Sequence, residues 1–161
     1  MIVSQYHFRP MSVGDLPLVR GWLARPHVAA WWHDGDDFEF VSGDLSHHDV
    51  AQFIVTTNEH PFGYLQCYRL GDWHKNFGPQ PNGTRGIDQV IAEPDMVGRG
   101  HGSAFIRQFT DGLLSSGTPR IVVDPDPENP RAIRAYEKAG FRRDHEVDTP
   151  DGRALLMVRD A

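Results

Sequence analysis

A strand, a glycine-rich turn and a helix follow one another between Gly86 and Phe105, and this order restricts the fold more than any other stretch. Residues 86–91 (GIDQVI) are a short apolar run with Asp88 embedded in it, which predicts a buried strand. Residues 93–95 (EPD) end that strand, and glycines follow at positions 98, 100 and 102. An amphipathic helix is then expected, whose apolar side comprises Phe105, Ile106, Phe109, Leu113 and Leu114.

The turn between this strand and this helix predicts an anion-binding site. Glycines let the backbone approach a ligand closely, and the open N–H groups and dipole of a helix N-terminus favour a phosphate. The dinucleotide fingerprint does not fit, because Ser103 stands where its last glycine is required, and the turn lacks the Gly-Lys pair of a P-loop. Taken alone, the turn is also compatible with a plain glycine-rich connection.

Composition limits the classes of protein that the chain can represent. Its 161 residues, 39% hydrophobic and 24% charged, predict a single globular domain over residues 1–161. The net charge of −6 argues against nucleic-acid binding and favours a cationic partner. One cysteine, no apolar leader in residues 1–10 and no run long enough to span a membrane lead us to expect a cytoplasmic protein without a membrane segment.

A second strand–helix unit follows the first. Residues 121–123 (IVV) predict another buried strand, and the helix between the two strands implies that they pair in parallel. Ligands bind at the carboxyl ends of such strands, so Asp88, the glycine turn and Asp124 are expected near one another. Asn129 and Pro130 then begin a helix that Gly140 ends, and strands are expected at 141–148 and 154–158.

The N-terminal half predicts an edge strand at 6–10, helices at 16–23 and 26–32, a loop with one turn of helix at 34–49, and a hairpin of 51–57 with 61–70. Adjacent helical residues point about 100° apart, so Trp31 and Trp32 do not both face one core unless the next segment covers them. Residues 71–85 form a long connection, which favours a lid or a flexible link.

Several polar side chains remain as candidates in this half. Tyr64, Gln66 and Tyr68 alternate along one strand, and their face either lines a polar cleft or is a half-exposed sheet face. Residues 47–49 (HHD) resemble a metal cluster, but zinc needs three or four converging ligands and no further ligand spacing supports a site. We therefore expect no metal. Cys67 is expected to be a small buried residue.

Two motifs, in order, resemble the GCN5-related N-acetyltransferase (GNAT) superfamily. Residues 97–102 (VGRGHG) are similar to its pyrophosphate loop, Gln/Arg-x-x-Gly-x-Gly/Ala, with Val97 at the first position, and residues 129–141 (NPRAIRAYEKAGF) are similar to its second hallmark. The resemblance covers about 86–141. It implies an α+β fold with a mixed, mostly antiparallel sheet of six or seven strands, one parallel pair at the acetyl-CoA cleft and about four flanking helices.

Within the superfamily the chain is most similar to aminoglycoside 6′-N-acetyltransferases. The similar strings are RGIDQ at 85–89, DPDPENPRAIRAYEKAGF at 124–141, TPDG at 149–152, GYLQCY at 63–68 and the tryptophan pair. This resemblance implies an antibiotic-resistance acyltransferase that moves an acetyl group from acetyl-CoA to a primary amine of a small cationic substrate. The departure lies at 72–80, which is acidic in the family but here contains Trp73, His74, Lys75 and Asn76.

The resemblance also implies roles for individual residues, with Asp88 as the base and Tyr136 as the acid that protonates the leaving thiolate. Contacts with coenzyme A are implied for Val90, Ile91, Val97, Gly98, Arg99, Gly100, His101, Gly102, Ser103 and Asn129. Contacts with the acceptor are implied for Trp31, Gln66, Tyr68, Asp88, Asp124 and Asp151.

Other interpretations of these residues and of the function remain open from the sequence. Asp88 is alternatively a structural acid, Tyr136 a packed aromatic residue and Asp151 a turn residue. The acceptor is alternatively a siderophore hydroxylysine, a metabolite or a protein N-terminus. The chain is alternatively a non-catalytic acyl-CoA-binding domain or an unrelated nucleotide-binding module, and it is either a monomer or a homodimer.

Overall fold

The computed structural model describes residues 6–32, 34–70 and 77–161, with residues 34–37 by their backbone alone. Its seven strands are hydrogen-bonded in the order β1-β2-β3-β4-β5-β7-β6, and β4 and β5 form a parallel pair. The expected α+β class with a mixed, mostly antiparallel sheet is confirmed. The strands are β1 (His7–Pro10), β2 (Val50–Thr57), β3 (His60–Arg69), β4 (Arg85–Ile91), β5 (Arg120–Val123), β6 (Arg142–Thr149) and β7 (Gly152–Asp160).

The chain divides into two compact units, each with its own hydrophobic core. The first unit comprises Met1–Cys67 and Asp88–Val97, and the second comprises Tyr68–Ile87 and Gly98–Ala161. The helices of the first unit are α1 (Leu16–Leu23), α2 (Pro26–Ala29) and α3 (Asp34–Asp44), and those of the second are α4 (His101–Ser115) and α5 (Pro130–Lys138). That residues 1–161 form one domain stays a prediction.

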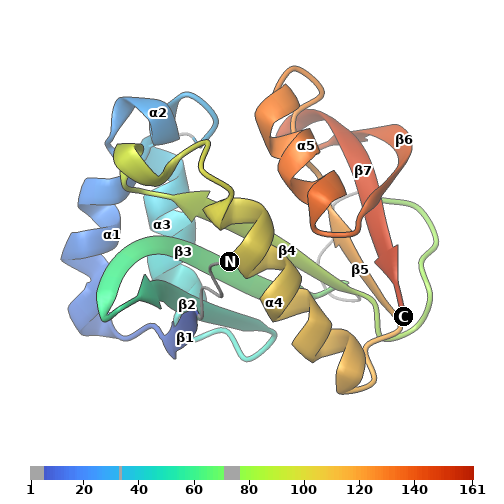
Figure 1. Ribbon diagram of the computed structural model, residues 1–161, viewed down its shortest axis with the longest axis horizontal. Helices are drawn as coiled ribbons and strands as arrows, with labels where there is room; N and C mark the ends of the chain where they lie inside the picture. Colours follow the sequence, from blue (N-terminus) through green and yellow to red (C-terminus); the bar gives the residue numbers. More distant parts are fainter. Residues whose placement is uncertain (1–5, 33, 71–76) are drawn as a thin grey trace. The chain divides into compact units, whose positions relative to one another are not determined.

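Helices α1, α2 and α3 lie together in the first unit, drawn in blue and cyan in Figure 1. Their buried faces meet residues of β2, β3 and β4 in one cluster, which is formed by Met11, Val19, Trp22, Leu23, Val28, Val41, Ile54, Tyr64, Val90 and Ala92. The tight turn between β2 and β3 uses positive φ angles at Asn58 (50°) and Glu59 (64°), as a two-residue hairpin requires. The predicted hairpin is therefore confirmed.

Helix α3 corrects the expectation of a loop with one helical turn at 34–49. It runs for 11 residues, because Phe38, Val41 and Leu45 recur at helical spacing and pack against the core of the first unit. The acidic residues of this stretch concealed that pattern. The two tryptophans behave as their spacing predicted, since Trp31 is 46% exposed and Trp32 packs against the core.

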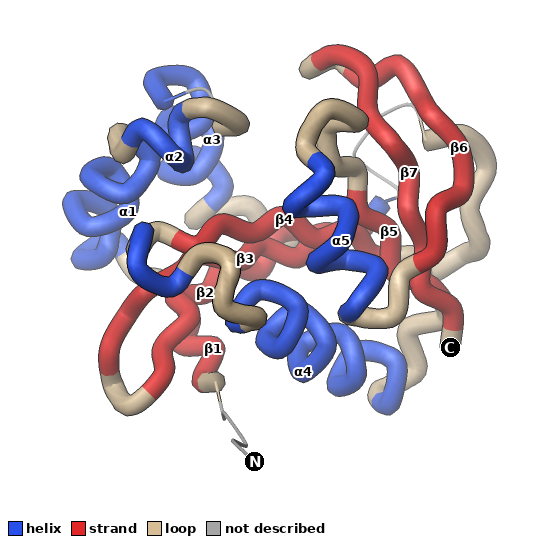
Figure 2. The backbone as a smooth tube through the Cα atoms, turned by 45° about the horizontal axis from the view of Figure 1, so that its top comes forward, coloured by secondary structure: helices blue, strands red, loops and turns tan. Residues whose placement is uncertain are grey.

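In the second unit, β6 and β7 lie side by side in Figure 2 and pair antiparallel, and β7 also pairs with β5. Parallel pairing of β4 with β5 joins Arg85 to Ile121 and Gly86 to Val122, as the intervening helix predicted. The core of this unit includes Phe77, Val122, Leu156 and Val158.

Both faces of β3 are buried between Phe62 and Tyr68, apart from the half-buried Gln66. The alternative of a half-exposed sheet face is therefore wrong. The part of the long connection at 77–84 is anchored in the second unit, because Phe77 lies in its core and Arg120 of β5 donates to Gln80 Oε1 at 3.1 Å. The expectation of a lid or a flexible link over residues 71–85 is not tested for residues 71–76, which lie outside the described residues.

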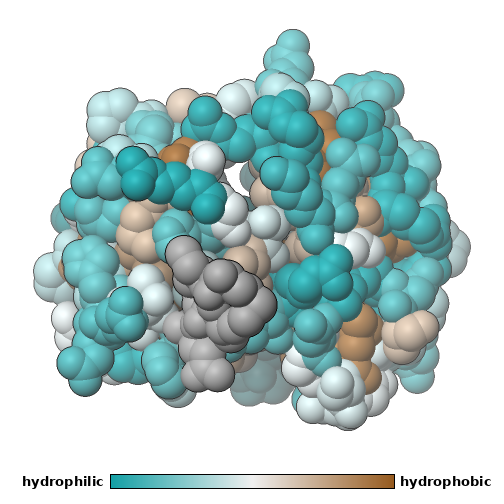
Figure 3. Space-filling view, in the orientation of Figure 1, coloured by the Kyte–Doolittle hydropathy of each residue, from teal (hydrophilic) through white to brown (hydrophobic). Residues whose placement is uncertain are grey.

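The surface seen in Figure 3 is mostly hydrophilic, with apolar residues in small separate areas. Among the described residues, no helix combines the length and the apolar character needed to cross a lipid bilayer.

Candidate active site

The side chain of Asp88 projects from β4, where it is half-buried. Its carboxylate oxygen Oδ2 accepts a hydrogen bond from Gln66 Nε2 on the neighbouring strand β3 at 2.9 Å. The structure thus brings together Asp88 and Gln66, two of the residues predicted from the sequence. A carboxylate set in an apolar strand is costly to bury without such a partner.

A chain of hydrogen bonds continues from Gln66 into the core of the first unit. The Tyr64 hydroxyl donates to Gln66 Oε1 at 2.7 Å, and Gln52 Nε2 donates both to that hydroxyl and to the Val41 carbonyl, each at 2.8 Å. Burial raises the pKa of Tyr64 well above its usual value, and the nearby carboxylates of Asp88 and Asp44 raise it further. The phenol therefore stays a neutral hydrogen-bond donor.

The end of β4 is held by polar side chains around α2. The carbonyl of Ile91 accepts from His27 Nε2 at 3.0 Å, so this nitrogen carries the imidazole proton. Arg25 donates to the Ala92 carbonyl at 2.7 Å and to the Glu93 carboxylate at 3.0 Å. With two successive carbonyls engaged, the backbone after Val90 has a defined direction.

Residues 88–91 of β4 lie beyond the two pairs that join β4 to β5. The close approach of β3 to this segment depends on Gly63, since a Cβ there would lie 2.8 Å from the Val90 carbonyl oxygen. Ala92 N–H donates to the Phe62 carbonyl at 2.7 Å and so continues the contact with β3. Val90 and Ile91, which are predicted from the sequence as contacts of coenzyme A, belong to this segment.

The exposed indole of Trp31 and the inward-facing Trp32 occupy different environments. Trp32 meets Tyr64 edge to face, with ring centroids 6.1 Å apart. Trp32 thus supports the hydrogen-bonded tyrosine, whereas Trp31 is the tryptophan that a ligand can reach.

In the second unit, the glycine turn leads directly into α4 with its backbone uncovered. Gly98 (φ 76°) and Gly100 (φ 86°) adopt left-handed conformations, and nothing lies within 4 Å of a Cβ built on either residue. The first backbone hydrogen bond of α4 joins Ala104 N–H to the Gly100 carbonyl at 3.1 Å. The amides of residues 101–103 precede that bond and are the donors that a helix N-terminus offers to an anion.

Helix α5 carries the other predicted acid and cap residues of this unit. Asn129 accepts from the Ala132 N–H at 3.3 Å, so its side chain caps the helix as predicted. Tyr136 is 6% exposed and packs edge to face on Phe141, with centroids 5.7 Å apart. The position of Tyr136 is therefore compatible both with a packing role and with donation of a proton. Gly140, with φ 105°, follows the helix.

The remaining predicted residues of the second unit differ in exposure. Asp124 is half-buried directly after β5, and Asp151 is exposed in the turn between β6 and β7. The Asp151 N–H donates to Thr149 Oγ1 at 3.2 Å, so the turn role of this residue is present. Tyr68 is buried, and its ring lies against Gly86.

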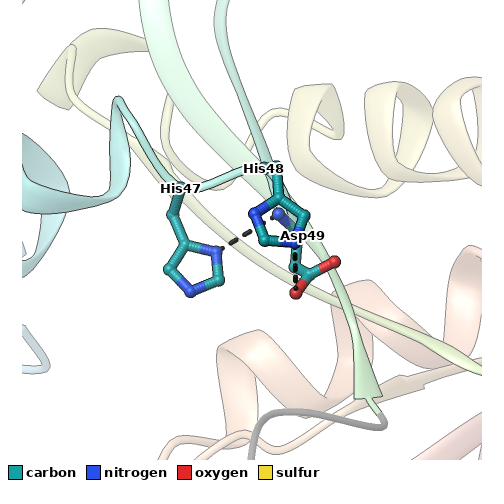
Figure 4. A group of neighbouring side chains, drawn as sticks. All are labelled: His47, His48 and Asp49. Carbon is teal, nitrogen blue, oxygen red and sulfur yellow. Dashed lines mark hydrogen bonds and ion pairs between the residues drawn. The ribbon is translucent and has the colours of Figure 1, made fainter.

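His47, His48 and Asp49 form the group of three potential metal ligands found among the described residues, with ligand atoms within 4.8 Å of one another. Figure 4 shows the two rings on the segment before β2. Their planes are 9° apart and their centroids are separated by 5.4 Å. A zinc site takes three or four converging ligands, and these three residues are sequence neighbours on one short segment. His47 Nδ1 also accepts the Asp49 N–H at 3.2 Å.

Sequence reasoning did not single out Gln52, Arg25 or His27, and it placed Tyr64 only on a shared face. One signal was present for Gln52, which is a lone amide in an otherwise apolar strand (AQFIV). Such a group is expected to have a buried hydrogen-bond partner.

Comparison with known proteins defines the class of the chain. The profile of the acetyltransferase (GNAT) domain matches residues 12–149, and the chain belongs to this family of acetyltransferases. The resemblance inferred from the two motifs is thus confirmed.

Individual proteins to which the chain is similar are more specific than the family profile. Aminoglycoside N(6′)-acetyltransferase type 1 of Klebsiella pneumoniae is 36% identical over 166 residues, which cover 94% of this chain and 81% of that protein. The structure of AAC(6′)-Ib with ribostamycin and coenzyme A matches with a TM-score of 0.88 and 35% identity, over 97% of this chain and 93% of that chain. Lysine N-acyltransferase MbtK of Mycolicibacterium paratuberculosis is 26% identical over 97% of this chain and 74% of that protein.

Proposed function

We propose that this protein transfers an acetyl group from acetyl-CoA to a primary amine of a small cationic molecule, with the 6′-amine of an aminoglycoside as the acceptor. The observation that carries the proposal is the half-buried carboxylate of Asp88 on β4, the strand that leads to the glycine turn. This carboxylate accepts a hydrogen bond from Gln66 on β3. The relatives solved with kanamycin or ribostamycin and coenzyme A support this choice of substrates. We assign the reaction to the cytoplasm, which suits a chain with one buried free cysteine.

The reaction begins with removal of a proton from the ammonium group by Asp88, directly or through a water molecule, because only the free amine is a nucleophile. The nitrogen then attacks the thioester carbonyl carbon, and the N–H groups of Val90 and Ile91 stabilise the resulting oxyanion. When the C–S bond breaks, the thiolate takes its proton from Tyr136. The nitrogen still carries one extra proton after the attack, and this proton passes through water to the Tyr136 phenolate. The products are an amide, coenzyme A and the proton that Asp88 releases to solvent.

Binding of coenzyme A is assigned to the uncovered backbone of the glycine turn. The left-handed glycines at 98 and 100 and the N-terminus of α4 that follows them suit a pyrophosphate. Val97 and Arg99 belong to the same turn, and Asn129, which begins α5, is assigned to the same ligand. A net charge of −6 makes a local backbone site more suitable for an anionic ligand than a general electrostatic field.

Binding of the acceptor is assigned to acidic and aromatic side chains. Asp124 and the exposed Asp151 attract amino groups, and the exposed Trp31 offers an aromatic face to a sugar ring or a cation. The half-buried Gln66 completes the set of acceptor contacts that we propose, whereas Tyr68, predicted as another contact, is 1% exposed and is not assigned to the acceptor.

A panel of acceptor amines tests the substrate class. The protein is incubated with acetyl-CoA and kanamycin, lysine, N6-hydroxylysine or spermidine, and released thiol is measured. We expect kcat/KM to be highest for kanamycin. Preference for a lysine would instead support the function suggested by the likeness to MbtK. Binding of coenzyme A without turnover of any amine would contradict the enzymatic proposal.

The role of Tyr136 is tested by its replacement with phenylalanine, which keeps the contact with Phe141. If the hydroxyl protonates the thiolate, kcat is expected to fall by about one to two orders of magnitude, with the thermal midpoint changed by only a few degrees. Initial rates and a melting curve measure the two effects. Phe141→Leu is the matched control, since it disturbs the packing and spares the hydroxyl. Unchanged kcat in Tyr136→Phe would assign Tyr136 to packing alone.

A further inference from the structure

We infer that Tyr64 and Gln52 are positioning residues, which orient the Gln66 amide so that its NH2 group, and not its oxygen, faces Asp88. This inference rests on the proposed function, because it concerns the same carboxylate. All members of the chain of hydrogen bonds belong to the first unit and come from β2, β3, β4 and α3.

The direction of each bond in this series of hydrogen bonds follows from the bond at its buried end, where Gln52 meets the Val41 carbonyl. The Val41 carbonyl is a backbone acceptor, so the amide group of Gln52 that contacts it must be the NH2. The same nitrogen gives its second proton to the Tyr64 hydroxyl. That hydroxyl has a single proton of its own, which it gives to Gln66 Oε1. With its oxygen occupied in this way, Gln66 has only its NH2 to direct at Asp88.

A reversed Gln66 amide is disfavoured at both of its ends. Its oxygen would face the carboxylate of Asp88, and its NH2 would face a Tyr64 hydroxyl that already accepts from Gln52. The tyrosine proton would then lose its acceptor in a fully buried position, where Tyr64 is 0% exposed. An unsatisfied buried donor costs free energy, so the network selects one amide orientation.

The surroundings of the network make this selection effective. Gln52 is 7% exposed and Trp32 covers the ring of Tyr64, so water is largely kept from the inner bonds. The charged groups that act on the hydroxyl are the carboxylates of Asp88 and Asp44. A donor fixed on Oδ2 holds the Asp88 carboxylate as an acceptor with a constant orientation, which a base that receives a proton from an ammonium group requires.

The first test is a double-mutant cycle between Tyr64 and Asp88. Tyr64→Phe removes the hydroxyl and keeps the ring, and we expect kcat to fall about tenfold while the KM of acetyl-CoA stays within about twofold. In an Asp88→Ala background the same change is expected to have no further effect. Tyr6→Phe is the matched control, because it removes another buried hydroxyl of the first unit and should leave kcat unchanged.

The second test does not depend on turnover. Hydrogen exchange of the Gln66 side-chain NH2 is followed by NMR, and its signals are assigned from their loss in Gln66→Leu. We expect the exchange rate to rise at least tenfold in Tyr64→Phe and in Gln52→Met, and to stay constant in Tyr6→Phe.

The outcomes separate this inference from the proposed function. Full activity of Asp88→Ala would overturn the role of the base, and with it the catalytic part of the inference. An equal loss of kcat from Tyr64→Phe in both backgrounds would identify a packing effect and overturn the positioning role alone. Unchanged exchange of the Gln66 NH2 in Tyr64→Phe would do the same, whatever the activity.

Discussion

Replacement of Asp88 by asparagine is expected to lower kcat for amine acetylation by about two to four orders of magnitude. Asparagine has nearly the same shape, and its side-chain oxygen still accepts the hydrogen bond from Gln66 Nε2 that Asp88 receives at 2.9 Å. What it loses is the ability to take a proton from the ammonium group. The change therefore isolates the chemistry of the carboxylate from its structural contacts.

The affinity for acetyl-CoA should change little in Asp88→Asn, because the open glycine turn is assigned to that ligand. Thiol release gives kcat, and calorimetric titration gives the dissociation constant of acetyl-CoA. Asp95→Asn is a matched control, since Asp95 is an exposed carboxylate in the same unit and should be replaceable without loss of kcat. Normal turnover in Asp88→Asn would remove Asp88 from the mechanism and leave it the role of a structural acid.

Local patterns account for the parts of this site that could be predicted from the sequence. The glycine turn, the Asn129 cap and the end of α5 at Gly140 depend on residues within a few positions of one another, and the structure has each of them where expected. The parallel pairing of β4 and β5 followed from the single helix that connects them.

Long-range pairing accounts for what could not be predicted. The contact between Gln52 and Tyr64 depends on how β2 and β3 lie against α3, and no local periodicity contains that information. The length of α3 depended in the same way on a core that covers Phe38 and Val41, in a stretch whose acidic composition suggests a solvent-exposed loop. Tertiary burial thus decided both features.

The same distinction applies to Gly86, whose role becomes visible only in the folded chain. In the sequence it is one residue of a strand, and glycine weakens a strand interior. In the structure, a Cβ on Gly86 would lie 2.2 Å from Tyr68 Cζ and 2.4 Å from its hydroxyl oxygen. The tyrosine ring thus occupies the volume that any other residue at position 86 would need.

Gly86→Ala is accordingly expected to lower the free energy of unfolding by about 3 kcal/mol, at the upper end of the usual cost of overpacking. Tyr68 is 1% exposed, so its ring has little room to move away. For a chain of 161 residues this corresponds to a fall of roughly 6–12 °C in the thermal midpoint. Urea unfolding and calorimetry measure the change.

Two further variants separate the clash with Tyr68 from a general effect of removing a glycine. Gly112→Ala lies in α4, where nothing is within 4 Å of the new Cβ, and it should raise stability by about 0.5–1 kcal/mol. Tyr68→Leu shortens the side chain at the point of contact, so the double variant with Gly86→Ala should be more stable than the sum of the two single changes predicts. Additive losses, or a Gly86→Ala protein as stable as the parent, would show that Tyr68 does not require glycine at this position.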